Sequence, residues 1–230
     1  MKKPLVIAHR GASGTELENS LAALRAAARD GADGVELDVH STADGEFIVH
    51  HDGVLDSVQI PLANAADVIA LRLANGEPVP TLAQGLEAIG PTLRVFVEVK
   101  TLDPRWDDAF LATLDRGPNP GNYAVHSFAF HVVHRLGIKR PGLPRGLLSE
   151  VYTRSLRQSL ADAKADTLWQ ERATIDEALI GAVHALGARI VAWTVDDPAD
   201  IARLTAWGVD GICTNYPARA RHVVETTRAA

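Results

Sequence analysis

The sequence predicts a single α/β domain, a closed (β/α)8 TIM barrel with a short insertion after its second strand. The chain has 230 residues, a length that suits one barrel. Short β-branched runs alternate with Ala/Leu-rich helical stretches, and eight such units follow one another along the chain. This alternation is typical of a parallel sheet covered by helices. Because no Gly/Ser tract, Pro-rich linker or charge block interrupts it, we expect residues 1–230 to form one domain.

The first half of the chain supplies three of the expected units. Asn19 or Ser20 can cap the first helix, and Thr81 can cap the second. The strands are runs rich in Val and Ile, which favour extended backbone. In chain order we expect a strand at Leu5–Ala8, a helix at Asn19–Asp30, a strand at Gly34–Val39, a short extra strand at Glu46–His50, a helix from Thr81 to about Ile89, a strand at Arg94–Val99 and a helix at Asp107–Leu114.

The second half repeats the pattern five times. Gly187 and Gly208 follow two of the helical stretches and are expected to end them. The expected strands are Tyr123–His126, Arg145–Leu148, Asp166–Trp169, Ile190–Val195 and Gly211–Thr214, and the helices are Ala129–Leu136, Thr153–Lys164, Thr174–Leu186, Pro198–Trp207 and Ala218–Thr226.

An open, doubly wound sheet is the alternative architecture. The turn from Gly11 to Gly14 follows the first strand, as a dinucleotide-binding turn would. It lacks the G-x-G-x-x-G spacing that brings a backbone close to a pyrophosphate, so we set the dinucleotide fold aside.

Composition narrows the class of protein. The chain has 23 basic and 29 acidic residues, a formal charge of −6, which argues against dedicated nucleic-acid binding. Its one cysteine, Cys213, excludes an intramolecular disulfide. The apolar runs are too short to cross a bilayer, and the one near the N-terminus is too short for a signal peptide. We therefore expect a soluble cytoplasmic protein without stable membrane insertion; the oligomeric state stays open.

Carboxylates gather where the barrel strands are expected to end, which is the active-site face of such a barrel. Glu36 and Asp38 lie two residues apart, so both project from one face of their strand. Glu98 and Lys100 repeat this spacing on the next barrel strand. Adjacent buried carboxylates need a cation, and three oxygen ligands without cysteine favour Mg²⁺ or Ca²⁺. A metal site of Glu36, Asp38 and Glu98 is thus predicted, with neutralisation by Arg or Lys as the alternative.

Two histidines and two cations flank the predicted metal site. His9 ends the first strand and His51 follows the extra strand; histidine titrates near neutral pH, so each could transfer a proton. Arg10 and Lys100 could bind phosphate oxygens. The alternatives are histidines that only cap strand ends and cations that only neutralise the carboxylates.

The candidate residues belong to longer motifs that are spread along the chain. These motifs are His9-Arg10-Gly11-Ala12, Leu17-Glu18-Asn19-Ser20, Gly31-Ala32-Asp33-Gly34-Val35-Glu36-Leu37-Asp38-Val39, Asp44-Gly45 through His51-Asp52, Pro80-Thr81-Leu82, Glu98-Val99-Lys100, His126-Ser127-Phe128, Trp193-Thr194-Val195-Asp196 and Gly208-Val209-Asp210-Gly211-Ile212-Cys213-Thr214-Asn215. In these motifs the chain resembles the glycerophosphodiester phosphodiesterase family. They follow that family's order from residue 9 to about 217 and so cover nearly the whole chain.

The resemblance implies a metal-dependent enzyme that releases glycerol 3-phosphate and an alcohol from glycerophosphodiesters. It implies general acid–base roles for His9 and His51 and substrate contacts for Arg10, Lys100 and Trp193. In the family, the glycerol 2-hydroxyl is thought to attack phosphorus, giving a cyclic phosphate that water opens.

The chain departs from the family pattern at several positions. Leu17 and Ser20 stand where the family usually has Pro and Thr, Asp196 where Asn is common, and Asn215 where Asp often stands. The stretch between His51 and Pro80, where the family carries a small helical insertion, is short.

The alternatives left open are a phospholipase D-like activity on lysophospholipids, a non-catalytic barrel that binds glycerophosphodiesters, and a metal-dependent aldolase or isomerase.

Overall fold

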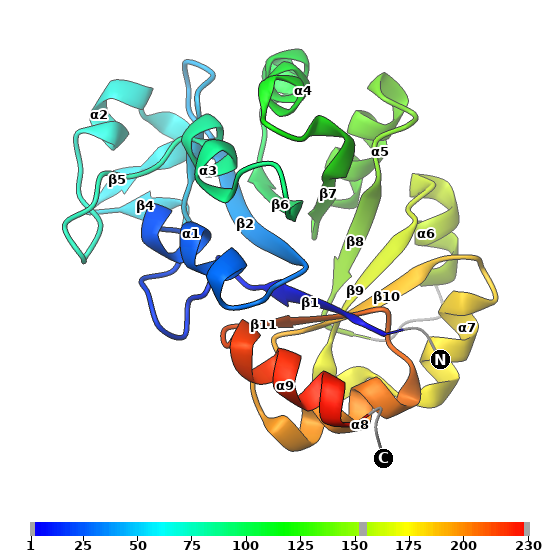
Figure 1. Cartoon of the computed structure of the whole chain (residues 1–230). Coiled ribbons are helices and arrows are strands. Elements are labelled where there is room, and N and C mark those ends of the chain that lie inside the picture. The colour runs from blue at the N-terminus through cyan, green and yellow to red at the C-terminus, as the bar shows by residue number, and fades with distance from the viewer. Residues whose placement is uncertain (1–2, 152–155, 228–230) are drawn as a thin grey trace.

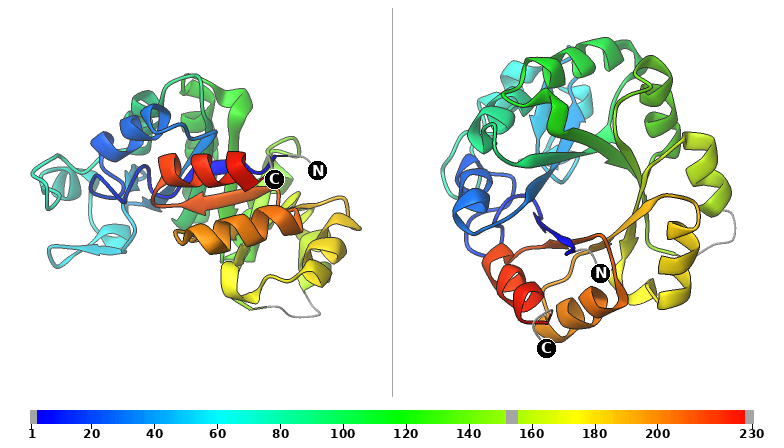
Figure 2. Two further views of the ribbon diagram at one scale, coloured as in Figure 1. Left: turned by 60° about the horizontal axis from the view of Figure 1, so that its bottom comes forward. Right: turned by 45° about the vertical axis from the view of Figure 1, so that its right-hand side comes forward.

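A computed structural model describes residues 3–151 and 156–227 of the chain. Eight parallel strands pair side by side, and the pairing of the first with the second closes the barrel. Viewed along the barrel axis, the helices form a ring around the strands (Figure 2). The (β/α)8 prediction is confirmed. The strands are β1 (Leu5–Ala8), β2 (Gly34–Ser41), β6 (Arg94–Thr101), β7 (Tyr123–Ser127), β8 (Arg145–Ser149), β9 (Thr167–Glu171), β10 (Arg189–Trp193) and β11 (Gly211–Thr214).

A helix follows each barrel strand and packs on the outside (Figure 1). Ser20 caps the first helix by accepting from the backbone N–H of Ala23. Thr81 and Gln84 form the reciprocal capping box of the second. The helices are α1 (Leu21–Arg29), α3 (Leu82–Ile89), α4 (Asp107–Arg116), α5 (Phe130–Lys139), α6 (Leu156–Ala163), α7 (Glu177–His184), α8 (Pro198–Trp207) and α9 (Pro217–Thr227).

Every expected helix except Pro198–Trp207 differs from the observed bounds by about one to three residues at one or both ends. The helix expected at Thr174–Leu186 begins at Glu177, because the carboxylate of Asp176 accepts from the backbone N–H of Leu179 and caps it there. A 3-10 turn, η4 (Arg172–Thr174), precedes it. Thr153, the expected start of the helix that became α6, lies outside the described residues.

The predicted insertion lies between β2 and α3, beside the ring of helices (Figure 1). The extra strand is present as β3 (Phe47–Val49), antiparallel to β2. The insertion packs around its own small apolar cluster, which includes Ile48, Ile60 and Val68. It also contains elements that the sequence did not predict: the hairpin β4 (Val54–Leu55) and β5 (Val58–Gln59), the 3-10 turn η1 (Ile60–Leu62) and helix α2 (Ala65–Ile69).

The inside of the barrel is apolar below the strand ends. Trp169 on β9 contacts Phe96 on β6 edge to face, with ring centroids 5.3 Å apart. Gly146 on β8 makes room for this packing, because a Cβ there would lie 2.8 Å from the Trp169 ring. The other buried members of the cluster are Ile7, Leu148, Val191 and Cys213. This layer forms the floor on which the polar residues of the strand ends rest.

Candidate active site

Polar residues lie level with the apolar floor and two positions beyond it, because Glu36 is in register with Phe96, and Asp38 with Glu98. Side chains alternate along a strand, so Phe96 and Glu98 share one face of β6, as Glu36 and Asp38 do on β2. The register aligns Asp38 with Glu98 and Glu98 with His126 on β7. The carboxyl ends of three neighbouring strands therefore carry acidic and imidazole groups side by side.

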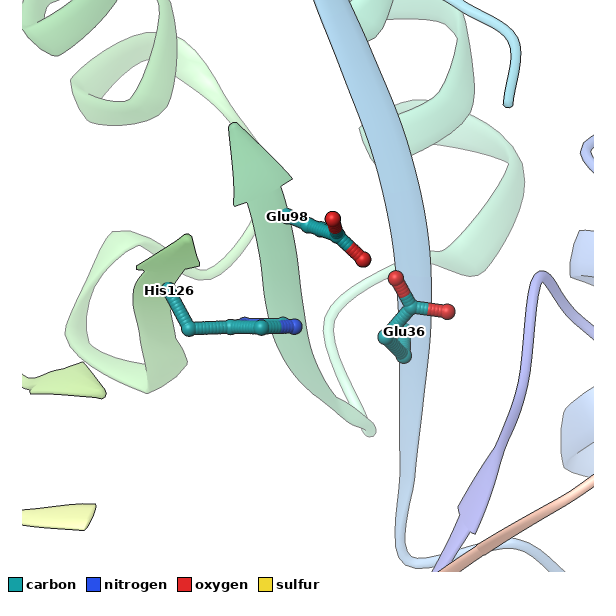
Figure 3. Close-up of side chains that lie close together, drawn as sticks. All are labelled: Glu36, Glu98 and His126. Atoms are coloured by element: carbon teal, nitrogen blue, oxygen red, sulfur yellow. The ribbon is translucent and has the colours of Figure 1, made fainter. Parts of the chain in front are cut away.

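Glu36, Glu98 and His126 form the centre of the site. Each offers a ligand atom, and these atoms lie within 4.8 Å of one another. All three residues are buried. The imidazole of His126 points toward the two carboxyl groups (Figure 3). His126 also stacks on Trp169, with ring centroids 4.1 Å apart and planes inclined by 5°, so the apolar floor holds the imidazole in place.

Burial controls the protonation of this cluster. Burial, followed by the charges of Asp38 and Glu98, raises the pKa of Glu36 well above its usual value. Burial and the charge of Asp38 raise the pKa of Glu98 to about 7, although Lys100 opposes the shift. Burial lowers the pKa of His126 to about 3. Near neutral pH the cluster therefore offers a neutral imidazole, and protons compete with a cation for Glu36 and Glu98.

The cluster fits a divalent cation. Among the described residues, Oε1 of Glu36 and Nδ1 of His126 are buried without a hydrogen-bond partner. Two carboxylates and one imidazole are a donor set that divalent metals accept, and such a cation would remove the repulsion between the carboxylates. No role for His126 was predicted, because an isolated histidine on a strand has no spacing signal; its only sequence signal is its place in the family-like motif His126-Ser127-Phe128. Its register opposite Glu98 is the observation that reveals it.

Asp38 lies beside this cluster but is bound by cations of the protein. Its carboxylate lies 3.1 Å from Nε of Arg10 and 3.2 Å from Nζ of Lys100, and it accepts from Nδ2 of Asn19 at 2.8 Å. Burial raises the pKa of Asp38, but the charges of Lys100 and Arg10 outweigh it and hold the pKa below its usual value. The metal-ligand role predicted for Asp38 therefore stays a prediction, and neutralisation by Arg and Lys is what the structure shows here.

Arg10 and Lys100 place positive charge at the mouth of the site. The side chains are 17% and 18% exposed, so both cations can still reach a ligand. Arg10 also pairs with Glu18 at 2.8 Å, and its backbone N–H donates to Glu36 at 3.0 Å. Lys100 pairs with Glu98 at 2.7 Å.

The loop that carries Arg10 turns sharply after β1. Gly11 has a φ of +81°, and a Cβ there would lie 2.5 Å from the backbone of Ala23. Arg10 and Asn19 also have positive φ, of 54° and 57°. This turn brings Asn19 to the carboxylate of Asp38, a contact that the motif alone did not reveal.

His9 and His51 each have one ring nitrogen held by a neighbour. Nδ1 of His9 lies 2.8 Å from Oδ1 of Asn215, and Nδ1 of His51 lies 2.8 Å from Oδ1 of Asp52. In both rings Nε2 remains for a ligand. The charge of Asp38 raises the pKa of His9, and the charge of His51 lowers the pKa of Asp38. Both histidines therefore lie near this carboxylate.

The two histidines differ in their surroundings. Burial and the charge of Arg10 lower the pKa of His9 below its usual value, which keeps the ring neutral near pH 7. The side chain of His51 is 34% exposed. Its backbone carbonyl accepts from Nε2 of His40 at 3.1 Å, which ties the loop of His51 to β2.

An aromatic pair stands at the ends of β7 and β10. Trp193, at the end of β10, contacts Phe128 edge to face, with ring centroids 5.7 Å apart. Phe128 is 44% exposed. The substrate contact expected for Trp193 stays a prediction.

Comparisons with known proteins decide the family. The sequence pattern of the glycerophosphoryl diester phosphodiesterase family matches residues 9–219. The chain belongs to this family. It is therefore an enzyme, a phosphoric diester hydrolase. A glycerophosphodiester phosphodiesterase of Caldanaerobacter subterraneus subsp. tengcongensis is 30% identical, over 94% of this chain and 95% of that protein.

Solved structures agree with the family assignment. A glycerophosphodiester phosphodiesterase of Parabacteroides distasonis has a TM-score of 0.89 and 25% identity, covering 99% of both chains. An Oleispira antarctica phosphodiesterase, solved with its product sn-glycerol-3-phosphate, shares the fold, with a TM-score of 0.89 and 24% identity over 96% of this chain and 97% of that one. Among the described residues, no helix is long and apolar enough to span a membrane.

Proposed function

We propose that this barrel hydrolyses glycerophosphodiesters to glycerol 3-phosphate and an alcohol in a reaction that requires a divalent cation, Mg²⁺ or Ca²⁺. The observation that carries the proposal is the cluster of Glu36, Glu98 and His126, whose ligand atoms lie within 4.8 Å of one another. Arg10 and Lys100 stand at its mouth, which suits an anionic small molecule.

Glu36, Glu98 and His126 would hold the cation, with Asp38 as a further candidate ligand. A bound divalent cation would neutralise charge on the phosphodiester and make phosphorus easier to attack. Arg10 and Lys100 would bind the remaining phosphate oxygens. Because Asp38 holds both cations in place, it orients them even where it does not bind metal.

The proton transfers are assigned to His9 and His51. In the first step the 2-hydroxyl of the glycerol gives its proton to one histidine and attacks phosphorus, while the other histidine protonates the oxygen of the leaving alcohol. The product is a cyclic phosphate. In the second step the histidines exchange roles: water gives up a proton, opens the ring and yields glycerol 3-phosphate.

The proposed nucleophile is tested with a substrate that lacks it. A phosphocholine diester of propane-1,3-diol has no 2-hydroxyl and should be cleaved at least about 100-fold more slowly than glycerophosphocholine, because intramolecular attack is lost. Phosphorus NMR should show a transient cyclic phosphate with glycerophosphocholine and none with the diester of propane-1,3-diol. Equal rates for the two diesters would contradict attack by the substrate and favour attack by water.

A further inference from the structure

Three loops at the carboxyl ends of β1, β10 and β11 are joined through one amide. Asn215 follows β11, and its Nδ2 donates to Oδ2 of Asp196, after β10, at 2.7 Å. The other carboxylate oxygen of Asp196 accepts from the backbone N–H of Asn215 at 2.8 Å and from the hydroxyl of Thr214 at 2.9 Å. Oδ1 of Asn215 faces Nδ1 of His9 at 2.8 Å.

This arrangement fixes which end of the amide faces His9. A carboxylate only accepts hydrogen bonds, so Asp196 must meet the NH₂ group of Asn215. The carbonyl oxygen of the same amide then points at His9. A carbonyl oxygen also only accepts, so the proton of the contact must be on Nδ1 of His9. The hydroxyl of Ser13 lies 2.8 Å from the same oxygen and 2.7 Å from the backbone carbonyl oxygen of His9; because a hydroxyl both donates and accepts, it fits either orientation, and Asp196 alone decides it.

The proton on Nδ1 determines the state of Nε2, the other nitrogen of the His9 ring. A neutral imidazole carries one proton, and when Nδ1 holds it, Nε2 has the lone pair. Burial and Arg10 lower the pKa of His9, so the neutral ring is the form present near pH 7. The tautomer therefore determines whether Nε2 can accept a proton.

We propose that Asp196 and Asn215 are positioning residues that hold His9 in the tautomer with its proton on Nδ1. Asn215 acts on the ring directly, and Asp196 acts through Asn215 by setting the orientation of its amide. The catalytic benefit rests on the proposed role of His9, whereas the tautomer itself does not depend on that role.

Asp196→Asn is the decisive substitution, because it keeps the shape of the side chain. The oxygen of the new amide must still accept from the backbone N–H of Asn215, so the new NH₂ group takes the place of Oδ2. Asn215 must then turn its own oxygen toward the substituted side chain and its NH₂ toward His9. The proton of His9 should move from Nδ1 to Nε2.

The readout is the ¹⁵N NMR spectrum of the His9 ring in the full-length protein at pH 7.5, where the two tautomers have distinct nitrogen shifts. The unchanged protein should show Nδ1–H and Asp196→Asn should show Nε2–H. In the same variant kcat should fall by about 100-fold or more, since an imposed wrong tautomer costs up to about 10⁴-fold in a catalytic triad.

The double exchange, Asp196→Asn with Asn215→Asp, provides the rescue. Every donor again faces an acceptor: the new amide at position 196 donates to the new carboxylate at position 215, which accepts from Nδ1 of His9. Both the Nδ1–H signal and at least about a tenth of the original kcat should return. Asp197→Asn is the matched control, because Asp197 only caps α8 and its change should move neither readout.

The spectra separate the proposal from the assignment of the function. If Asp196→Asn leaves His9 in the Nδ1–H tautomer, the proposal is wrong. If the proton moves but kcat on glycerophosphocholine is unchanged, the tautomer proposal holds and the proposed proton-transfer role of His9 is wrong. A loss of kcat that the double exchange does not rescue, with no change of tautomer, would show a purely structural role for the pair.

Discussion

His9→Ala and His51→Ala are each expected to lower kcat on glycerophosphocholine by about 100-fold or more, the usual loss when a general acid or base is removed. Both rings have Nδ1 engaged by an acceptor, so each presents Nε2 for proton transfer. Initial rates at saturating substrate and metal would measure the loss. The melting temperature of each variant must be measured beside it.

A structural role for these histidines makes the opposite forecast. It predicts a lower melting temperature with near-normal kcat in the folded fraction. His134→Ala is the matched control, because His134 lies on α5 and its Nδ1 contacts the backbone carbonyl of Asp162 on α6. This variant should keep its kcat whichever role the other two histidines have.

Adding Mg²⁺ or Ca²⁺ to metal-free protein is expected to raise its melting temperature, and more strongly at pH 8 than at pH 5.5. The pKa of Glu98 is raised to about 7, and that of Glu36 is raised too. Because protons and the cation compete for these carboxylates, cation affinity should increase as pH rises through 7. At a concentration 100 times Kd, binding stabilises a protein by about 2.7 kcal/mol. In a domain of this size that is a shift of roughly 5–10 °C.

The same pKa shifts determine whether the stability of the metal-free protein rises or falls with pH. A carboxyl group whose pKa is raised on folding contributes stability below its unfolded pKa, and this contribution is lost as pH rises through the folded value. Glu98 should therefore make the metal-free protein less stable at pH 8 than at pH 5.5.

Substitution of a ligand checks where the cation binds. Glu36→Gln should abolish most of the cation-dependent shift, whereas Glu177→Gln, on the outer helix α7, should leave it unchanged. An equal shift in the Glu36→Gln variant and the original protein would contradict the metal site.

The sequence predicted the barrel well because its strands and helices carry strong local signals. The runs at Leu5–Ala8, Pro198–Trp207 and Gly211–Thr214 have the bounds that were expected. The elements of the insertion were harder to predict from the sequence. The hairpin and the five-residue α2 are too short for a periodic pattern, and a small apolar cluster assembled by the fold holds them together.

The site was predictable where one strand carries the whole signal. The two-residue spacing of Glu36 and Asp38, and of Glu98 and Lys100, placed each pair on one face of its strand. Contacts between residues of different strands could not be predicted from spacing within one strand. His126 joins the cluster only through the register of β6 and β7, and the pairing of Asp196 with Asn215 requires the loops after the neighbouring strands β10 and β11 to meet.

The most direct test of the central claim is an assay for glycerol 3-phosphate with purified protein, glycerophosphocholine and either a chelator or added Mg²⁺ or Ca²⁺. Lysophosphatidylcholine is run in parallel. We expect glycerol 3-phosphate from glycerophosphocholine, none after chelation, and recovery when the cation is restored. Undiminished release in the presence of chelator would contradict metal dependence. Turnover of lysophosphatidylcholine with none of glycerophosphocholine would contradict the proposed substrate class.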